Sequence, residues 1–193
     1  MLSVNTPNEA AILPRRSFLT GATKITLSAT AIALLAGNDG LAVANAHAAT
    51  SNDVTILNSA LGAEQEAVAA YQLGADSGLL QKPVLALAVQ FQGHHKQHVE
   101  TLAKTIKQLG GTPVAPPKSF SFPTDKLKSQ TDVLAFAAGL EKGAVSAYLG
   151  AVPILQNREL AKAAASILGD EAMHWAVLRQ ALGQDPVPVA FVS

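Results

Sequence analysis

A polar pattern that occurs twice is the feature that most constrains the fold of this chain. Residues 64–71 read EQEAVAAY and residues 141–148 read EKGAVSAY, an offset of 77 positions. Residues 95–98, HKQH, align with residues 171–174, EAMH, at an offset of 76. The sequence therefore predicts two matching halves, each with one segment that carries a glutamate and one that carries a polar pair at a spacing of three.

Each half is predicted to form two amphipathic helices. Apolar or small side chains recur three or four positions apart, which is the period of one helix face. The first helix is expected to begin near Ser51, Asn52 and Asp53, with one of these residues as its N-cap. The four helices are expected over residues 53–76, 83–109 and 131–152, and around the apolar stripe from Leu160 to Leu182. This pattern predicts an all-α domain.

Ionisable side chains interrupt these apolar stripes at six positions. A Glu-x-x-His pair on one helix lies about one turn apart on one face, and di-metal carboxylate bundles use such inward pairs. Burying these groups without partners would be costly. They are therefore either metal ligands or members of a polar core network in which Glu and His satisfy each other. The candidate ligands are Glu64, His95, His98, Glu141, Glu171 and His174.

Other polar and aromatic residues lie beside these positions. Tyr71 and Tyr148 are either hydrogen-bond donors to the inward glutamates or amphipathic core residues. His94 lies off the stripe, and we expect it to be solvated, with a place in the site as a substitute for His95 as the alternative. We also expect Glu66 to be solvated. Trp175 is expected to pack in the core.

The segment from about residue 110 to residue 129 is expected to be a crossover. It contains four prolines and has no helical period, and loops of this length are uncommon within compact domains. A helix of about 25 residues is roughly 37 Å long, a distance that about 20 extended residues can span. The segment therefore indicates ferritin-like connectivity, with a long connection between the second and third helices. A linker between two separate hairpins is the alternative.

Residues 1–48 have the character of an export signal. Arg15 and Arg16 precede an apolar run over 25–37, and small residues follow as far as Ala48. This arrangement resembles a Tat-type signal, with an ordinary secretory signal as the alternative. The apolar run is too short to span a bilayer. We therefore expect the signal to be removed, leaving one domain over 49–193, without a membrane span, in the periplasm or outside the cell.

Composition restricts the chemistry of the site. The sequence contains no cysteine, so a metal site in this chain must use Glu, Asp and His. Lys and Arg number 14, as do Asp and Glu, and no basic cluster occurs. This balance argues against a nucleic-acid partner.

Four segments of the chain resemble the ferritin-like superfamily. They read LGAEQEAVAAYQLG, HVETLAKTIKQLGG, LEKGAVSAYLGAVPIL and AASILGDEAMHWAVL, and the resemblance covers the whole mature region. It is nearest to small exported bacterial ferritin-like proteins related to desiccation-associated proteins. It implies a four-helix bundle whose di-iron carboxylate site takes one Glu from each of two helices and a Glu-x-x-His pair from each of the others. On the matching positions it implies Glu64, His98, Glu141, Glu171 and His174 as ligands.

His95 departs from this pattern, because the family has glutamate at that position. A carboxylate can bridge two ions, whereas a neutral imidazole has one lone pair to give. The substitution lowers the expected affinity for a second hard cation and favours metals that accept nitrogen ligands. We expect one or two ions of iron or manganese, with zinc as an alternative. A di-metal site with altered ligation, a mononuclear site and a lost site remain open.

Two kinds of function follow from the resemblance. One is redox chemistry with oxygen or peroxide, as in an oxidase, a ferroxidase or a catalase-like enzyme. The other is a non-catalytic stress-related, desiccation-related or structural envelope protein with a degenerate metal site. The sequence leaves open whether the chain is an enzyme and whether it forms a homo-oligomer.

Overall fold

The computed structural model describes residues 51–192, which form four long helices and no strand. These helices are α3 (Ser51–Asp76), α4 (Lys82–Gln108), α5 (Gln130–Ala151) and α6 (Arg158–Ala181), and a short 3₁₀ helix, η2 (Thr124–Lys126), precedes α5. The all-α prediction is confirmed, whereas the predicted signal over 1–48 lies outside the described residues. Within residues 51–192, no helix combines the length and apolar character needed to cross a membrane.

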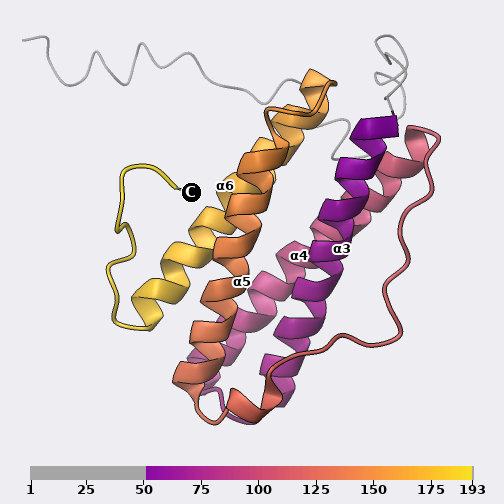
Figure 1. Cartoon of the computed structure of the whole chain (residues 1–193). Helices are drawn as coiled ribbons and strands as arrows, with labels where there is room; N and C mark the ends of the chain where they lie inside the picture. Colours follow the sequence, from indigo (N-terminus) through magenta and orange to yellow (C-terminus); the bar gives the residue numbers. More distant parts are fainter. Residues whose placement is uncertain (1–50, 193) are drawn as a thin grey trace, which may run out of the picture.

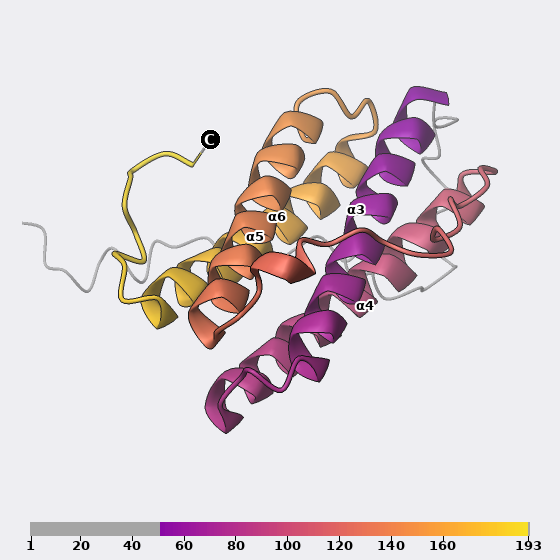
Figure 2. The ribbon, with the colours of Figure 1, turned by 60° about the horizontal axis from the view of Figure 1, so that its bottom comes forward.

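The helices form a bundle of two hairpins. α3 packs along α4 and α5 packs along α6, and the hairpins meet partly through α3 and α5. Figures 1 and 2 show the two hairpins side by side, with α3 and α5 on one face of the bundle and α4 and α6 behind them. This is the predicted four-helix bundle.

Residues with suitable side chains or backbone freedom determine where the helices begin and end. The side chain of Ser129 accepts a hydrogen bond from the backbone N–H of Asp132 at the start of α5, and Asn157 acts in the same way for α6. α4 begins with proline in its first turn. It ends before Gly110, whose φ of +78° is readily adopted only by glycine.

The connection from α4 to α5 is a crossover, as predicted, and it does not separate two independent hairpins. It runs across α3 before it reaches η2 and α5 (Figure 2). Asn58 on α3 bonds to the backbone of Thr112 and Val114, and Gln65 donates to the Val114 carbonyl. These amide side chains satisfy backbone groups of a segment that has no helix of its own.

The apolar core is divided into two clusters by a polar layer. One cluster lies towards the α5–α6 turn, and its largest fully buried side chains are Leu61 and Ile106. The other gathers around Phe91 and Leu178. Burial of these side chains is the main stabilising contribution to the bundle. The layer between the clusters holds the ionisable residues described below.

Asp53 does not have the role that the sequence suggested. It was a candidate N-cap of the first helix, yet its fully buried carboxylate accepts hydrogen bonds from the backbone N–H groups of Gln156 and Asn157, at 2.9 and 3.0 Å. Asn157 is also the N-cap of α6. Asp53 therefore joins the beginning of α3 to the α5–α6 turn, more than 100 residues further along the chain.

Replacement of Asp53 by alanine is expected to lower the free energy of unfolding by about 1–3 kcal/mol, because two backbone N–H groups of the α5–α6 turn would lose their buried acceptor. Urea denaturation monitored by circular dichroism measures this change. Glu66→Ala is the matched control, since Glu66 is an exposed carboxylate on the same helix. Equal effects of the two substitutions would contradict the role assigned to Asp53.

Candidate metal centre

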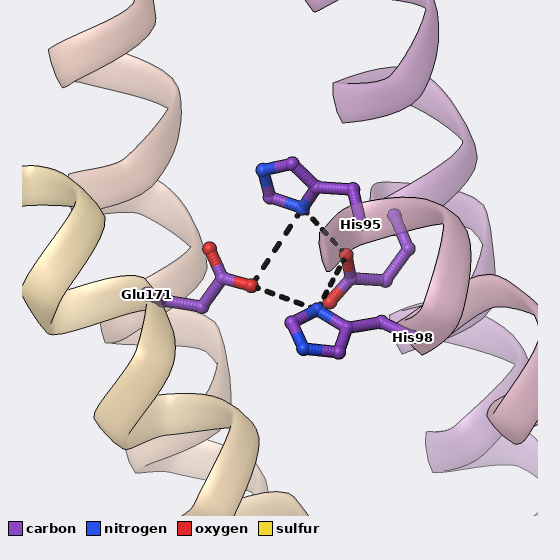
Figure 3. A group of neighbouring side chains, drawn as sticks. His95, His98 and Glu171 are labelled. Atoms are coloured by element: carbon purple, nitrogen blue, oxygen red, sulfur yellow. Dashed lines mark hydrogen bonds and ion pairs between the residues drawn. The ribbon is translucent and has the colours of Figure 1, made fainter. Parts of the chain in front are cut away.

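The structure brings all six candidate ligands together in the polar layer. His95, Glu141, Glu171 and His174 are at most 1% exposed, Glu64 is 3% exposed, and the His98 side chain is 15% exposed. Figure 3 shows His95 and His98, from α4, facing Glu171, from α6. Two sets of four ligand atoms lie within 4.8 Å of one another, namely Glu64, His95, His98, Glu171 and His95, Glu141, Glu171, His174.

The ionisable groups that α3 and α4 contribute to the layer have hydrogen-bond partners, some of them on α5. Glu64 Oε1 accepts a hydrogen bond from the Tyr148 hydroxyl at 2.6 Å, and Oε2 lies 2.8 Å from His95 Nδ1 and 3.3 Å from His98 Nδ1. Burial raises the pKa of Glu64, but the bonds from the two imidazoles outweigh burial and lower the pKa to about 2. Glu64 is therefore an ionised carboxylate with partners on both oxygens.

His95 bridges two glutamates from different hairpins. Its Nδ1 faces Glu64, and its Nε2 lies 3.2 Å from Glu141 Oε1. Burial lowers the pKa of His95, but its hydrogen bonds to Glu141 and Glu64 raise it to about 10. Since ionised carboxylates only accept hydrogen bonds, both ring nitrogens must donate, and the metal-free protein holds an imidazolium ion between the two glutamates.

The other half of the layer, built from α5 and α6, is left unsatisfied. The buried atoms Glu141 Oε2, both carboxylate oxygens of Glu171, and His174 Nδ1 have no hydrogen-bond partner. In the described part of the chain, Gln65 Oε1 is the one further buried side-chain atom of this kind. Glu171 Oε1 lies 3.2 Å from His98 Nδ1, but without hydrogen-bond geometry. Unsatisfied oxygen and nitrogen atoms gathered in one place fit a metal ion.

The pKa values of the two carboxylates of this half are shifted in opposite directions. Burial, together with the neighbouring Glu141, raises the pKa of Glu171. Burial also acts to raise the pKa of Glu141, but the neighbouring imidazoles of His174, 3.6 Å away, and His95 outweigh it and bring the pKa below its usual range. Two carboxylates with free oxygens beside each other attract a cation.

Two tyrosines connect the halves reciprocally. Tyr71, on α3, donates to Glu141 on α5, and Tyr148, on α5, donates to Glu64 on α3. Burial and the adjacent carboxylates raise the pKa of both hydroxyls well above the usual value, so both remain protonated donors. Of the two roles considered from the sequence, the structure supports that of donors to the glutamates.

Two residues beside the six complete the polar layer, and sequence reasoning misjudged one and missed the other. His94 was expected to be solvated, but its side chain is 33% exposed and its Nδ1 lies 2.9 Å from His174 Nε2. Asp170 was not considered, and its Oδ2 lies 3.2 Å from His94 Nδ1 and 3.4 Å from His174 Nε2. His94 and Asp170 are 76 positions apart, the same offset as in the repeat. Extending the repeat by one residue would have found both.

A groove of about 540 Å³ lies between α3 and α5 and reaches the polar layer from that face of the bundle, opposite the face of α4 and α6. Half of the residues that line it are alanine or glycine, and Glu64, His95, Glu141 and Tyr148 also line it. Three helical glycines along α5 meet nothing that a Cβ atom would touch, so they leave the groove open. The groove therefore borders Glu64 and Glu141, which are themselves buried.

The chain belongs to a known family. The family model for the ferritin-like domain matches residues 52–184, which include all four helices. No curated protein matches the sequence.

Solved structures share the fold at low sequence identity. A conserved hypothetical protein from Mycobacterium tuberculosis has a TM-score of 0.64 and 19% identity, over 69% of this chain and 98% of that protein. A ferritin-like, diiron-carboxylate protein from Bacillus anthracis gives 0.60 and 22%, over 72% and 99%. A mycobacterial bacterioferritin gives 0.61 and 19%, over 69% and 84%. These likenesses establish a ferritin-like four-helix bundle.

The free energy of unfolding of the metal-free protein is expected to fall as the pH rises from about 6.5 to 10. The pKa values of His95, His98 and His174 are raised to about 10, 9 and 9, whereas an unfolded histidine titrates near 6.5. The stabilisation is therefore complete below pH 6.5 and is lost as the pH passes through the folded values. Urea denaturation in the presence of a chelator measures the profile.

Glu64→Gln is the informative comparison for this profile, because it removes a carboxylate that faces both His95 and His98. The slope between pH 6.5 and 10 should become shallower in this variant. A flat profile in the unmodified protein, or the same slope in both proteins, would contradict the assigned ion pairs.

Proposed function

We propose that this chain is an exported ferritin-like protein that binds one or two transition-metal ions, iron or manganese, in the core of its bundle. The observation that carries the proposal is the set of unsatisfied atoms on Glu141, Glu171 and His174. In a protein that binds no ion, burying two carboxylates with free oxygens would be a large uncompensated cost. A divalent ion satisfies the carboxylates and the imidazole together.

The first ion is assigned to the α5–α6 half. Glu141, Glu171 and His174 offer oxygen and nitrogen ligands, a combination that suits iron, manganese and zinc. The first ion would displace one proton, from His174, whereas a second ion beside Glu64 would displace two, from the imidazole rings of His95 and His98 that the neighbouring carboxylates keep protonated. The site is therefore expected to fill in two unequal steps, and one ion is the main form at neutral pH.

A redox role is the first of two candidate activities. Iron or manganese bound at this position supplies one-electron chemistry towards oxygen or peroxide. The chain's own contribution is to orient Glu64 and Glu141 through Tyr148 and Tyr71, and to leave the α3–α5 groove open to a small oxidant. An oxidase, ferroxidase or catalase-like reaction fits this arrangement.

A non-catalytic role is the second candidate, and the position of His95 favours it. His95 places a positive charge between Glu64 and Glu141, where a family site would have a ligand to metal. A protein with such a reduced site would bind an ion for stability or storage, as a stress-related, desiccation-related or structural envelope protein.

Metal content after native export is expected to be about one equivalent of iron or manganese per chain, because only the α5–α6 half has free ligand atoms. The measurement is elemental analysis of protein recovered from the envelope fraction, whose presence there also tests export. The double substitution Glu171→Ala, His174→Ala should abolish binding, whereas Glu64→Gln should retain it. Metal-free protein in every case would remove the proposed function. Recovery only from the cytoplasm would remove the export proposal.

Turnover is expected to distinguish the two candidate roles. The iron-loaded and manganese-loaded proteins are mixed with oxygen or hydrogen peroxide, and oxidant consumption is recorded beside the Glu171→Ala variant. Activity lost in the variant supports the enzyme, since the free carboxylate belongs to the ion's ligand set. A loaded protein that consumes no oxidant leaves the non-catalytic role.

A further inference from the structure

A second cluster of potential ligands lies at the outer side of the polar layer, between α4 and α6. His94 Nδ1, Asp170 Oδ2 and His174 Nε2 lie within 4.8 Å of one another. His94 and Asp170 are 33% and 22% exposed, whereas the His174 side chain is 2% exposed. We call these three residues the rim cluster. It therefore extends from the partly exposed His94 and Asp170 to the buried His174.

The spacing within the rim cluster suits a metal ion. The three pairs of atoms are 2.9, 3.2 and 3.4 Å apart. Ligands bound at 2.0–2.1 Å in a tetrahedral arrangement lie roughly 3.3 Å from one another. His98 Nε2 also lies 3.5 Å from Asp170 Oδ2, which adds an imidazole on the inner side. Two imidazoles and a carboxylate are a common ligand set for zinc, iron or cobalt.

His174 belongs to both the rim cluster and the core. Its Nδ1 faces inward, 3.6 Å from Glu141 Oε1 and 3.7 Å from Glu171 Oε2, while its Nε2 faces the rim. A neutral imidazole has one lone pair, so it can bind an ion through one nitrogen while the other carries a proton. An ion at the rim and an ion in the core therefore compete for the same ring.

The core is expected to bind the ion more strongly than the rim cluster does. The rim cluster offers one carboxylate, Asp170, which is partly exposed to water. The core offers Glu141 and Glu171, both buried and both with free oxygens. Attraction of a divalent ion is stronger between two carboxylates at low dielectric than beside one near solvent. An ion bound at the rim therefore gains stability by moving inward.

We propose that the rim cluster is an acquisition site, where a divalent transition-metal ion binds from solution before it passes to the core by way of the His174 ring. The proposal rests on the proposed metal-binding function. On moving inward, the ion would leave Nε2 and take the place of the proton on Nδ1, which would be released to solvent, and Nε2 would take up a proton from water at the partly exposed rim, so the ring would carry one proton before and after the step. The protonated Nε2 then faces Asp170 and His94, which hold the ring in its inward-binding form.

The first test uses Co²⁺ as the probe, because its visible absorption reports coordination. Metal-free full domain is mixed with Co²⁺ in a stopped-flow instrument, and the rate and final amount of binding are recorded. His94→Ala should slow loading by about tenfold or more while the final stoichiometry stays the same, since loss of one supporting group typically weakens a metal site by 10–100-fold. Gln97→Ala is the control, because Gln97 is an exposed residue on α4 that donates only to its own helix backbone.

The α3–α5 groove is the rival route for ions. Gly143 lines this groove, and no atom lies near the position of an added Cβ. The substitution Gly143→Leu should therefore place a side chain in the groove and narrow it. It should leave Co²⁺ loading unchanged. Normal loading in His94→Ala would overturn the acquisition site and leave core binding intact. Slow loading in Gly143→Leu together with normal loading in His94→Ala would assign uptake to the groove.

The second test examines the rim cluster alone. The double variant Glu141→Gln, Glu171→Gln removes both inward carboxylate charges, and its fold is checked by circular dichroism. It should bind one weaker equivalent of Co²⁺, which is lost when His94→Ala is added. Absence of binding in the folded double variant, or binding that persists without His94, would overturn the proposal. An unmodified protein that takes up no ion would instead overturn the proposed function, and the transfer step with it.

Discussion

Burial of three carboxylates in one layer is the constraint on which the rest of this structure depends. Each of Glu64, Glu141 and Glu171 is at most 3% exposed. Removing ionised carboxylates from water costs several kcal/mol each unless cations and donors replace the lost solvent. Their partners must therefore be built into the bundle. Imidazoles from α4 and α6 provide the positive charge, and tyrosine hydroxyls from α3 and α5 provide neutral donors.

The same constraint explains how the two hairpins are held together. Direct packing between the hairpins is limited, and it occurs mainly where α3 meets α5. The tyrosine–glutamate bonds cross this boundary in both directions, and His95 joins a glutamate of each hairpin. Asp53 ties α3 to the turn before α6, and the crossover is bonded to α3. Polar contacts thus add to the two apolar clusters, whose side chains come from both hairpins, in fixing how the hairpins pack together.

The periodicity of the sequence was sufficient to predict most of this arrangement. A glutamate or histidine that lies on the apolar stripe of a helix faces the core with that stripe. The three glutamates and three histidines of the polar layer could therefore be identified as inward-facing from their spacing. The two tyrosines were left between two roles, because spacing does not show which hairpin an aromatic hydroxyl reaches. His94 and Asp170 were misjudged or missed because they lie at the edge of a stripe, where a helical wheel predicts solvent. Their contact exists only because α4 and α6 bring equivalent positions of the repeat together. This contact depends on how two helices pack against each other, and the periodicity of a single helix carries no information about that packing.

The repeat also clarifies why the site is unsymmetrical although the scaffold is nearly symmetrical. In a fully matched pair of halves, position 95 would be glutamate, and the layer would hold four carboxylates. With histidine there, the α3–α4 half contains its own cation, and Glu64 has partners on both oxygens. In the other half, Glu171 stands at the position equivalent to His95, and neither of its carboxylate oxygens has a hydrogen-bond partner. The difference between His95 and Glu171 therefore gives the two halves different properties. In the α3–α4 half, the positive charge of His95 offsets the glutamate charge, and His95 also joins the two hairpins. The α5–α6 half keeps free ligand atoms for an ion. Asymmetry of this kind favours a single bound ion, because the charge that a second ion would supply is already present as an imidazolium.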